Sequence, residues 1–313
     1  MVLQLIMEPT SPKSSWFDEL WPRLTVASGV GYLVMAYAVS RWLTRRSPAV
    51  LELPSDLGEV RIEPLECRTR DSITLKGWSF EPPTPCATIA LFHGMRLNRT
   101  TLLDRIAFLC AAGYRCVAFD HRAHGESGGR WTSFGYHERH DVEAVASLIG
   151  TRWPNSPCAA IGVSMGAAAI CFSGAKAHAF DALILESVYH NLNSAFQHRL
   201  GCGYPSWFGH FRRGILWLTE RRLGASISEV APFAHIANLA PRPILLLTGS
   251  DDPHAPPCDV EELAAQLPHW CQFHIIPGAG HDDVCSKGGL AYRDLLLAFL
   301  ERNLSLRNNS LAA

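Results

Sequence analysis

The strongest constraint on the fold is an alternation of apolar runs with helical segments along most of the chain. Six largely apolar runs of seven or eight residues recur: 87–94, 114–120, 158–164, 182–189, 243–249 and 272–278. Segments with helical spacing, such as 100–112 and 136–152, separate them. Short apolar runs bounded by turn residues are typical of buried strands, and strands that alternate with helices favour a parallel sheet. We therefore expect an α/β fold with a mostly parallel, doubly wound sheet.

Segments outside this alternation indicate the domain organisation. The period-2 pattern of residues 61–80 predicts two antiparallel strands joined by a turn at Arg70 and Asp71. Residues 189–240 interrupt the alternation and include Trp207 and Trp217, which we interpret as a helical cap insertion. The predicted parts are an N-terminal segment 1–23, a helix 24–43, a linker 44–59, the main domain 60–302 and a tail 303–313.

The N-terminal helix is expected from the stretch Leu24–Val39, which contains no charged residue. Arginines flank it on both sides and tryptophans lie near its ends, as in the aromatic belts of transmembrane helices. Extended to Leu43 it reaches about 20 residues, the span of a bilayer core. We predict a transmembrane anchor over 24–43, with the main domain in the cytoplasm because the larger arginine cluster follows the helix. An interfacial helix and an amphipathic helix packed on the domain are the alternatives.

Composition limits the partners of the chain. Its 313 residues are 48% hydrophobic and 18% charged, with a formal net charge of −1. Without a basic surplus, nucleic acid is not expected as a partner. The ten cysteines are scattered and form no C-x-x-C pair, which favours reduced thiols in a reducing compartment.

The segment Gly162-Val163-Ser164-Met165-Gly166 fits the pattern G-x-S-x-G between an apolar run and a small-residue helix. A sharp strand-to-helix turn needs glycine on both sides, because a Cβ atom would collide with the neighbouring backbone. Such a turn exposes the serine hydroxyl at a helix N-terminus, where negative charge is favoured. We predict that Ser164 is a nucleophile; the alternative is an ordinary turn whose serine caps the helix.

A serine hydroxyl is a weak nucleophile without a base, and in this architecture the acid and the histidine follow the serine along the chain. His281 lies in a glycine-rich loop after the last apolar run, so we predict that it is the base. The acid that orients it is expected after residue 249, where Asp251 and Asp252 compete. Glu186, at the end of the fourth run, is a more distant alternative.

Acyl transfer also requires two backbone N–H groups that stabilise the negative oxygen of the tetrahedral intermediate. One is expected from Met165, directly after the nucleophile. The other is expected from Met95, in the loop where His93-Gly94 ends the first apolar run. We expect His93 itself to hold that loop.

Between about residues 60 and 302, six segments occur in the order of a known family: LFHGMRLNRT, AFDHRAHGESGG, IGVSMGAAAI, LILESVYHNL, PILLLTGSDDPHAPP and IIPGAGHDD. The chain resembles α/β-hydrolases of the serine aminopeptidase-like, BAAT-like and prolyl-oligopeptidase-related group, which includes membrane-anchored hydrolases of the ABHD type. In that family the acid lies three residues after the glycine that ends the strand, which selects Asp252. The resemblance implies a serine hydrolase without cofactor or metal. The group contains esterases, thioesterases, lipases and peptidases.

Rival interpretations concern the substrate, metals and catalysis itself. The expected cap has few acids beyond Glu220 and Glu229, which favours an ester or thioester over a peptide with a free amino terminus. The expected partner is a small-molecule or lipid-like acyl substrate. Two H-x-x-H pairs, at residues 121–124 and 137–140, lack cysteines at zinc-finger spacing, so we interpret them as loop and surface histidines. A membrane-tethered scaffold that keeps the fold without catalysis is the alternative from a different class.

Overall fold

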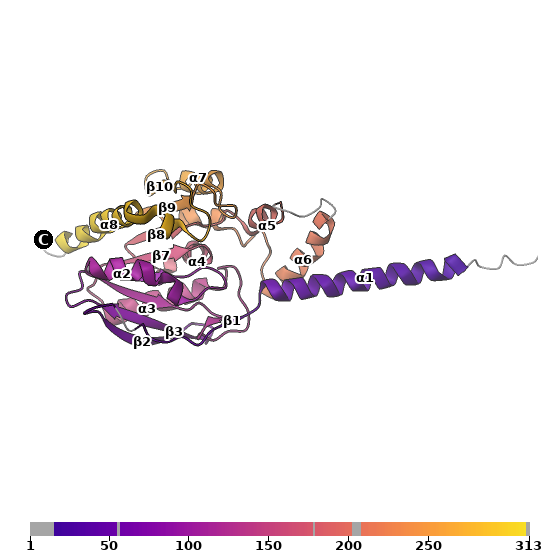
Figure 1. Cartoon of the computed structure of the whole chain (residues 1–313), viewed down its shortest axis with the longest axis horizontal. Helices are drawn as coiled ribbons and strands as arrows, with labels where there is room; N and C mark the ends of the chain where they lie inside the picture. Colours follow the sequence, from indigo (N-terminus) through magenta and orange to yellow (C-terminus); the bar gives the residue numbers. More distant parts are fainter. Residues whose placement is uncertain (1–15, 55–56, 178, 202–207, 311–313) are drawn as a thin grey trace, which may run out of the picture.

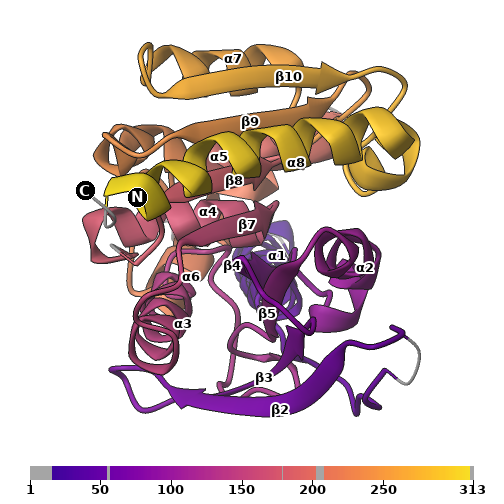
Figure 2. The same cartoon turned by 90° about the vertical axis from the view of Figure 1, so that its left-hand side faces the viewer.

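The computed structural model describes residues 16–54, 57–177, 179–201 and 208–310. Its centre is an eight-stranded sheet in the order β10-β9-β8-β7-β4-β5-β3-β2 (Figure 2). The strands are β2 Arg61–Arg68, β3 Thr74–Glu81, β4 Ala87–Phe92, β5 Tyr114–Phe119, β7 Cys158–Val163, β8 Ala182–Glu186, β9 Ile244–Gly249 and β10 Cys271–Ile276. Neighbouring strands are parallel except where β3 pairs with β2 and β5. The expected α/β fold with a mostly parallel sheet is confirmed.

Helices cover both faces of the sheet because its strands are apolar on both sides. In β4, Ala90 and Phe92 belong to one core cluster, whereas Ile89 and Leu91 belong to the other. The first cluster includes residues of α3 Arg139–Arg152, α4 Met165–Ser173 and α7 Pro257–Ala265. The second includes residues of α2 Leu103–Ala111 and α8 Val284–Ser310. The doubly wound arrangement is therefore present.

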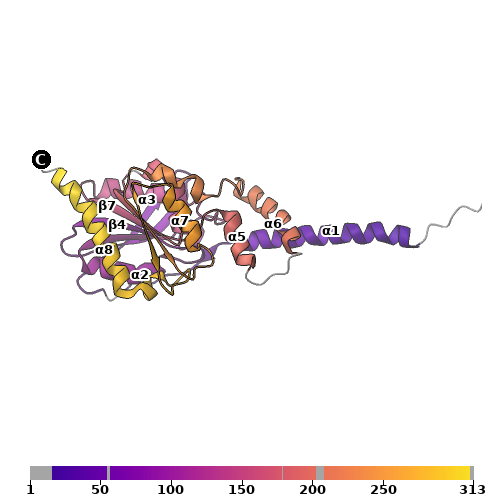
Figure 3. The same ribbon diagram turned by 90° about the horizontal axis from the view of Figure 1, so that it is seen from above.

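The insertion between β8 and β9 is helical, as expected. It contains α5 Leu192–Gly201, α6 Phe208–Leu223 and two short 3-10 turns, Pro232–Ala234 and Ile236–Leu239. Two further 3-10 turns, Arg99–Leu102 and Gly174–Ala177, lie in the main domain. Figures 1 and 3 show α5 and α6 beside one end of the sheet, with α6 near the N-terminal helix.

The N-terminal helix α1 extends over Trp16–Leu43 and projects from the domain (Figure 1). One side of it packs on α6. The Tyr32 hydroxyl accepts a hydrogen bond from the Gly214 N–H at 2.9 Å, and the Thr219 hydroxyl bonds that of Ser40 at 3.2 Å. The alternative of an amphipathic helix packed on the domain therefore applies to this side of α1.

The prediction of a transmembrane anchor over 24–43 is wrong. In the part of the chain that the structure describes, no helix has the combination of length and apolar character that crossing a membrane requires. The physical reason is that glycines and small polar residues interrupt the apolar stretch. Some of these residues, such as Ser40 and Thr44, are buried against other parts of the chain. The cytoplasmic placement, which the scattered cysteines also favour, stays a prediction.

Part of the expected linker is integrated into the domain. The short strand β1, Ser47–Pro48, pairs in parallel with β6, His124–Gly125. The Ser47 N–H donates to the Ala123 carbonyl at 2.8 Å, and the Ala49 N–H donates to that of Gly125 at 3.0 Å. The segment after α1 is thus fixed to the loop that follows β5.

Candidate active site

Ser164 lies in a strained turn between β7 and α4. Its φ of 52° and ψ of −110° are unusual for a residue with a side chain. A Cβ atom on Gly162 would lie 2.6 Å from the Ala167 nitrogen, and one on Gly166 would lie 2.3 Å from the Phe92 carbonyl oxygen. Only glycine fits on either side, so this tight turn is specified by the sequence, as expected.

The structure brings Ser164, His281 and Asp252 into one chain of hydrogen bonds. The Nε2 atom of His281 lies 2.8 Å from the Oγ atom of Ser164. Its Nδ1 atom lies 2.9 Å from each carboxylate oxygen of Asp252. Because a carboxylate accepts, Nδ1 carries the proton, and Nε2 is left as the acceptor for the serine hydroxyl. A histidine nitrogen placed in this way can accept the proton of a serine hydroxyl.

Asp252 is buried, yet its surroundings favour the ionised carboxylate. Its Oδ1 atom accepts from the backbone N–H groups of His254 at 2.8 Å and Ala255 at 2.9 Å. Burial raises the pKa of this carboxyl, but the hydrogen bond and charge of His281, together with the two N–H donors, outweigh burial and lower the pKa. Asp251 is exposed and accepts from the Ser250 hydroxyl instead.

Within the described part of the chain, Glu186, the more distant alternative for the acid, makes no hydrogen bond with His281 but holds the strand beside Ser164 in place. Its fully buried carboxylate bonds the Arg105 guanidinium at 2.5 Å and accepts from the Tyr292 hydroxyl. Its backbone carbonyl accepts from the Ser164 N–H at 2.8 Å. Glu186 therefore ties the strand next to the nucleophile to α2 and α8. No local pattern in the sequence indicates this role.

The loop of Met95 is held by two buried histidines. Nε2 of His93 accepts from the His121 N–H at 3.0 Å, so its Nδ1 donates to the Gly94 carbonyl at 2.7 Å. The expectation that His93 holds this loop is met by these contacts. Burial lowers the pKa of His93, in keeping with a neutral ring.

His124 is a second support of this loop, and the sequence analysis missed that role. Its Nε2 accepts from the Arg96 N–H at 3.0 Å, while its Nδ1 donates to the Arg122 carbonyl at 2.8 Å. Burial lowers its pKa as well. Arg96 has a φ of 64°, which turns the chain directly after Met95. No local pattern around His124 indicated this role, because the contact joins two loops that are 28 residues apart in the chain.

A cavity of about 240 Å³ opens beside Ser164. Met95 and Met165, the two predicted donors, line it together with Ser164 and His281. The other side chains in its wall are mostly apolar: Leu43, Leu97, Phe134, Val163, Tyr189, Leu192, Ala195 and Phe196. The cavity is thus enclosed by the end of α1, the cap helix α5 and loops at the carboxyl end of the sheet.

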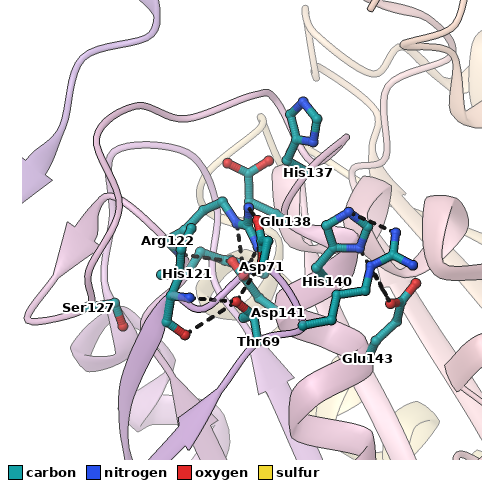
Figure 4. Close-up of polar contacts among 12 residues, drawn as sticks. Thr69, Asp71, His121, Arg122, Ser127, His137, Glu138, His140, Asp141 and Glu143 are labelled. Atoms are coloured by element: carbon teal, nitrogen blue, oxygen red, sulfur yellow. Dashed lines mark hydrogen bonds and ion pairs between the residues drawn. The ribbon is translucent and has the colours of Figure 1, made fainter. Parts of the chain in front are cut away.

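His121 belongs to a polar network around Arg122, and His140 contacts Arg70 and Glu143 beside it (Figure 4). His140 is buried, so the interpretation as a surface histidine is wrong for this residue. The Arg122 guanidinium bonds Asp141 through Nε at 2.9 Å and Asp71 through a terminal nitrogen at 2.7 Å. His121 lies 3.3 Å from Asp141, and the ring of His140 lies 3.1 Å from an Arg70 nitrogen. Within the described residues, no group of three or more potential ligands could hold a metal ion.

Known proteins resemble this chain over most of its length. A family profile described as serine aminopeptidase, S33 matches residues 83–221. The uncharacterized protein YqkD of Bacillus subtilis is 28% identical over 236 residues, which cover 72% of this chain and 75% of that protein. The protein YfhR of Salmonella typhi, also uncharacterized, is 25% identical and covers 78% of this chain and 83% of its own length.

Solved structures show the same fold. The esterase Pf2001 of Pyrococcus furiosus superposes with a TM-score of 0.70 at 22% identity, covering 83% of this chain and 98% of that one. A thermophilic esterase from Thermogutta terrifontis gives a TM-score of 0.57 at 19% identity, covering 77% of this chain and 99% of its own. At these identities the likeness establishes the architecture alone.

Proposed function

We propose that this chain is a serine hydrolase of the α/β-hydrolase superfamily and cleaves an ester or thioester through an acyl-enzyme on Ser164. The observation that carries the proposal is the hydrogen-bonded chain from Ser164 through His281 to Asp252. This chain ends in a mainly apolar cavity, which suits an acyl group.

The geometry supports a two-step acyl transfer. His281 Nε2 removes the proton from the Ser164 hydroxyl as its oxygen attacks the carbonyl carbon. The N–H groups of Met95 and Met165 stabilise the resulting oxyanion. His281 then protonates the leaving oxygen or sulfur, and afterwards activates the water that hydrolyses the acyl-enzyme. Asp252 stays ionised and stabilises the imidazolium in both steps.

The cavity favours a modest acyl group. Its volume of about 240 Å³ lies below the roughly 300–1,000 Å³ that is usual for sites of drug-sized ligands. Phe134 and Phe196 stack edge to face at 5.9 Å and form part of the wall. We expect short or medium acyl chains to be cleaved faster than long ones.

A peptidase acting on a free amino terminus is the second candidate, because the matching family profile is named after an aminopeptidase. Such an enzyme needs a carboxylate that pairs with the substrate ammonium. Among the described residues of the cavity wall, Asp282 is the single carboxylate, and it is exposed. Glu220 and Glu229 accept from Ile227 and Ser226 within the cap. The geometry therefore favours ester or thioester substrates.

Labelling with a fluorophosphonate, followed by peptide mapping, tests the nucleophile. Labelling is expected at Ser164, to vanish in Ser164→Ala, and to persist in Ser286→Ala, which changes an exposed serine of α8. p-Nitrophenyl esters, acyl thioesters and aminoacyl anilides then separate the substrate classes. Failure of the folded protein to react with any of these probes would favour the scaffold interpretation.

A further inference from the structure

The outward side of α1 carries a row of exposed apolar side chains. Val30 is 55% exposed, Leu33 51%, Val34 63% and Tyr37 50%. Leu33 and Val34 lie three and four residues after Val30, and Tyr37 lies four and three residues after them, so the four residues share one side of the helix. Large apolar side chains that are exposed together mark interaction surfaces in soluble domains. We define this row, Val30, Leu33, Val34 and Tyr37, as the outward face of α1.

An adjoining strip of the helix packs on α6, since Ala36 follows Leu33 by three residues and Ser40 follows Tyr37 by three. Ala36, Ser40 and Thr44 are buried, and the Arg222 guanidinium of α6 donates to the Thr44 hydroxyl at 2.6 Å. Packing on α6 therefore fixes the rotation of α1 about its axis. The outward face itself stays exposed, and Figures 1 and 3 show α1 extending beyond the domain.

The charge around the outward face has one sign. Residues 24–51 contain Arg41, Arg45 and Arg46 but no aspartate or glutamate. All three arginines are exposed. Trp42, 47% exposed, lies beside them, and its ring stacks on the guanidinium of Arg96. Apolar residues next to arginines and amphipathic aromatic rings are the features of helices that lie in the interface of an anionic bilayer.

A parallel two-fold contact between the outward faces of two copies would bring their arginine clusters together, whereas an antiparallel contact would place each cluster towards the Asp18-Glu19 end of the other helix. A second copy would therefore satisfy the arginines in one orientation alone. An anionic lipid surface supplies both the apolar layer and the negative charge. We propose that the outward face of α1 docks on the surface of a bilayer that contains anionic lipids, without spanning it.

This docking position would place the cavity next to the membrane. Leu43, the last residue of α1, lines the cavity beside Ser164. The Arg96 side chain donates to the Trp42 carbonyl at 3.2 Å, and the Ser47 hydroxyl donates to the Arg96 carbonyl at 3.2 Å. The end of the docked helix is thereby joined to the residue after Met95. Acyl substrates dissolved in the membrane could enter from this side, an extension that rests on the proposed hydrolase function.

Co-sedimentation of the full chain with vesicles tests the docking. The protein is expected to bind phosphatidylcholine vesicles that contain about 30% phosphatidylglycerol more tightly than vesicles of phosphatidylcholine alone. Leu33→Asp/Val34→Asp should weaken binding by about tenfold or more, because it places two carboxylates in the apolar layer. The matched control is Leu290→Asp, since Leu290 is 73% exposed on α8, away from α1 (Figures 1 and 3). This control should bind like the unmodified protein.

Two further measurements separate the outcomes. Arg45→Gln should weaken binding to the anionic vesicles alone, by about fivefold. Hydrolysis of a water-soluble short ester should be unchanged in Leu33→Asp/Val34→Asp, so that docking and catalysis fail independently. Lack of binding to either vesicle, or an equal loss in Leu290→Asp, would overturn the proposal. A dimer that becomes monomeric in Leu33→Asp/Val34→Asp, without vesicle binding, would assign the face to a second copy.

Discussion

Replacing Asp141 by Asn removes the charge that faces the buried guanidinium of Arg122. The Asp141 carboxylate is 2% exposed and accepts from Arg122 through the backbone N–H at 2.8 Å, through Nε at 2.9 Å and through a terminal nitrogen at 2.8 Å. Loss of one partner from a buried ion pair costs about 3–5 kcal/mol of unfolding free energy. Asp71 still bonds the same guanidinium, so we expect a loss near the lower limit, about 3 kcal/mol.

The matched variant is Asp71→Asn, which changes the other carboxylate of the network. The Asp71 side chain is 40% exposed, so water can solvate the Arg122 guanidinium where the Asp71 charge is removed. We expect a loss of about 1 kcal/mol or less. Urea denaturation followed by circular dichroism measures both, and the comparison requires unchanged slopes of the unfolding free energy against urea concentration. If the two variants lost the same unfolding free energy within about 0.5 kcal/mol, burial would not determine how much the Arg122–Asp141 pair stabilises the fold.

Three further predictions concern the site and its surroundings. Asp252→Asn should lower kcat by about 10⁴-fold in an ester assay, because His281 loses its preferred tautomer; full activity would refute the proposed role. Burial raises the pKa of Glu138, but hydrogen bonds from Ser133 outweigh it and the pKa is lowered. Its stabilising effect is present above about pH 4.3 and lost as pH falls through the lowered pKa, so acid titrations of Glu138→Gln should lack that loss. Gly249→Ala would put a Cβ atom 2.1 Å from the Ala279 carbonyl oxygen, so kinetics should show about tenfold lower kcat as the His281 loop moves.

The sheet and the main contacts of the site could be predicted because both depend on local patterns. Apolar runs that end in glycine identified the strands, and the glycines around Ser164 identified the turn. The choice between Asp251 and Asp252 could not be made from spacing and came from a family resemblance. The structure places Asp252, not Asp251, within hydrogen-bonding distance of His281.

Long-range packing explains what the sequence did not reveal. The contacts of Ser40 and Thr44 with α6 join positions nearly 180 residues apart, and nothing local in the apolar stretch announces them. A hydropathy pattern therefore suggested a bilayer where one side of the helix has a protein partner. The hydrogen bond between His124 and the Met95 loop could not be predicted for the same reason, because it joins two loops that are distant in the sequence.

The pairing of β1 with β6 means that α1 is not an interchangeable module. Residues 47–49 exchange hydrogen bonds with the same loop that carries His124. A gene fusion that substitutes another leading helix up to residue 50 would therefore remove the partner of β6 and disturb the loop around His124 as well as the point of attachment.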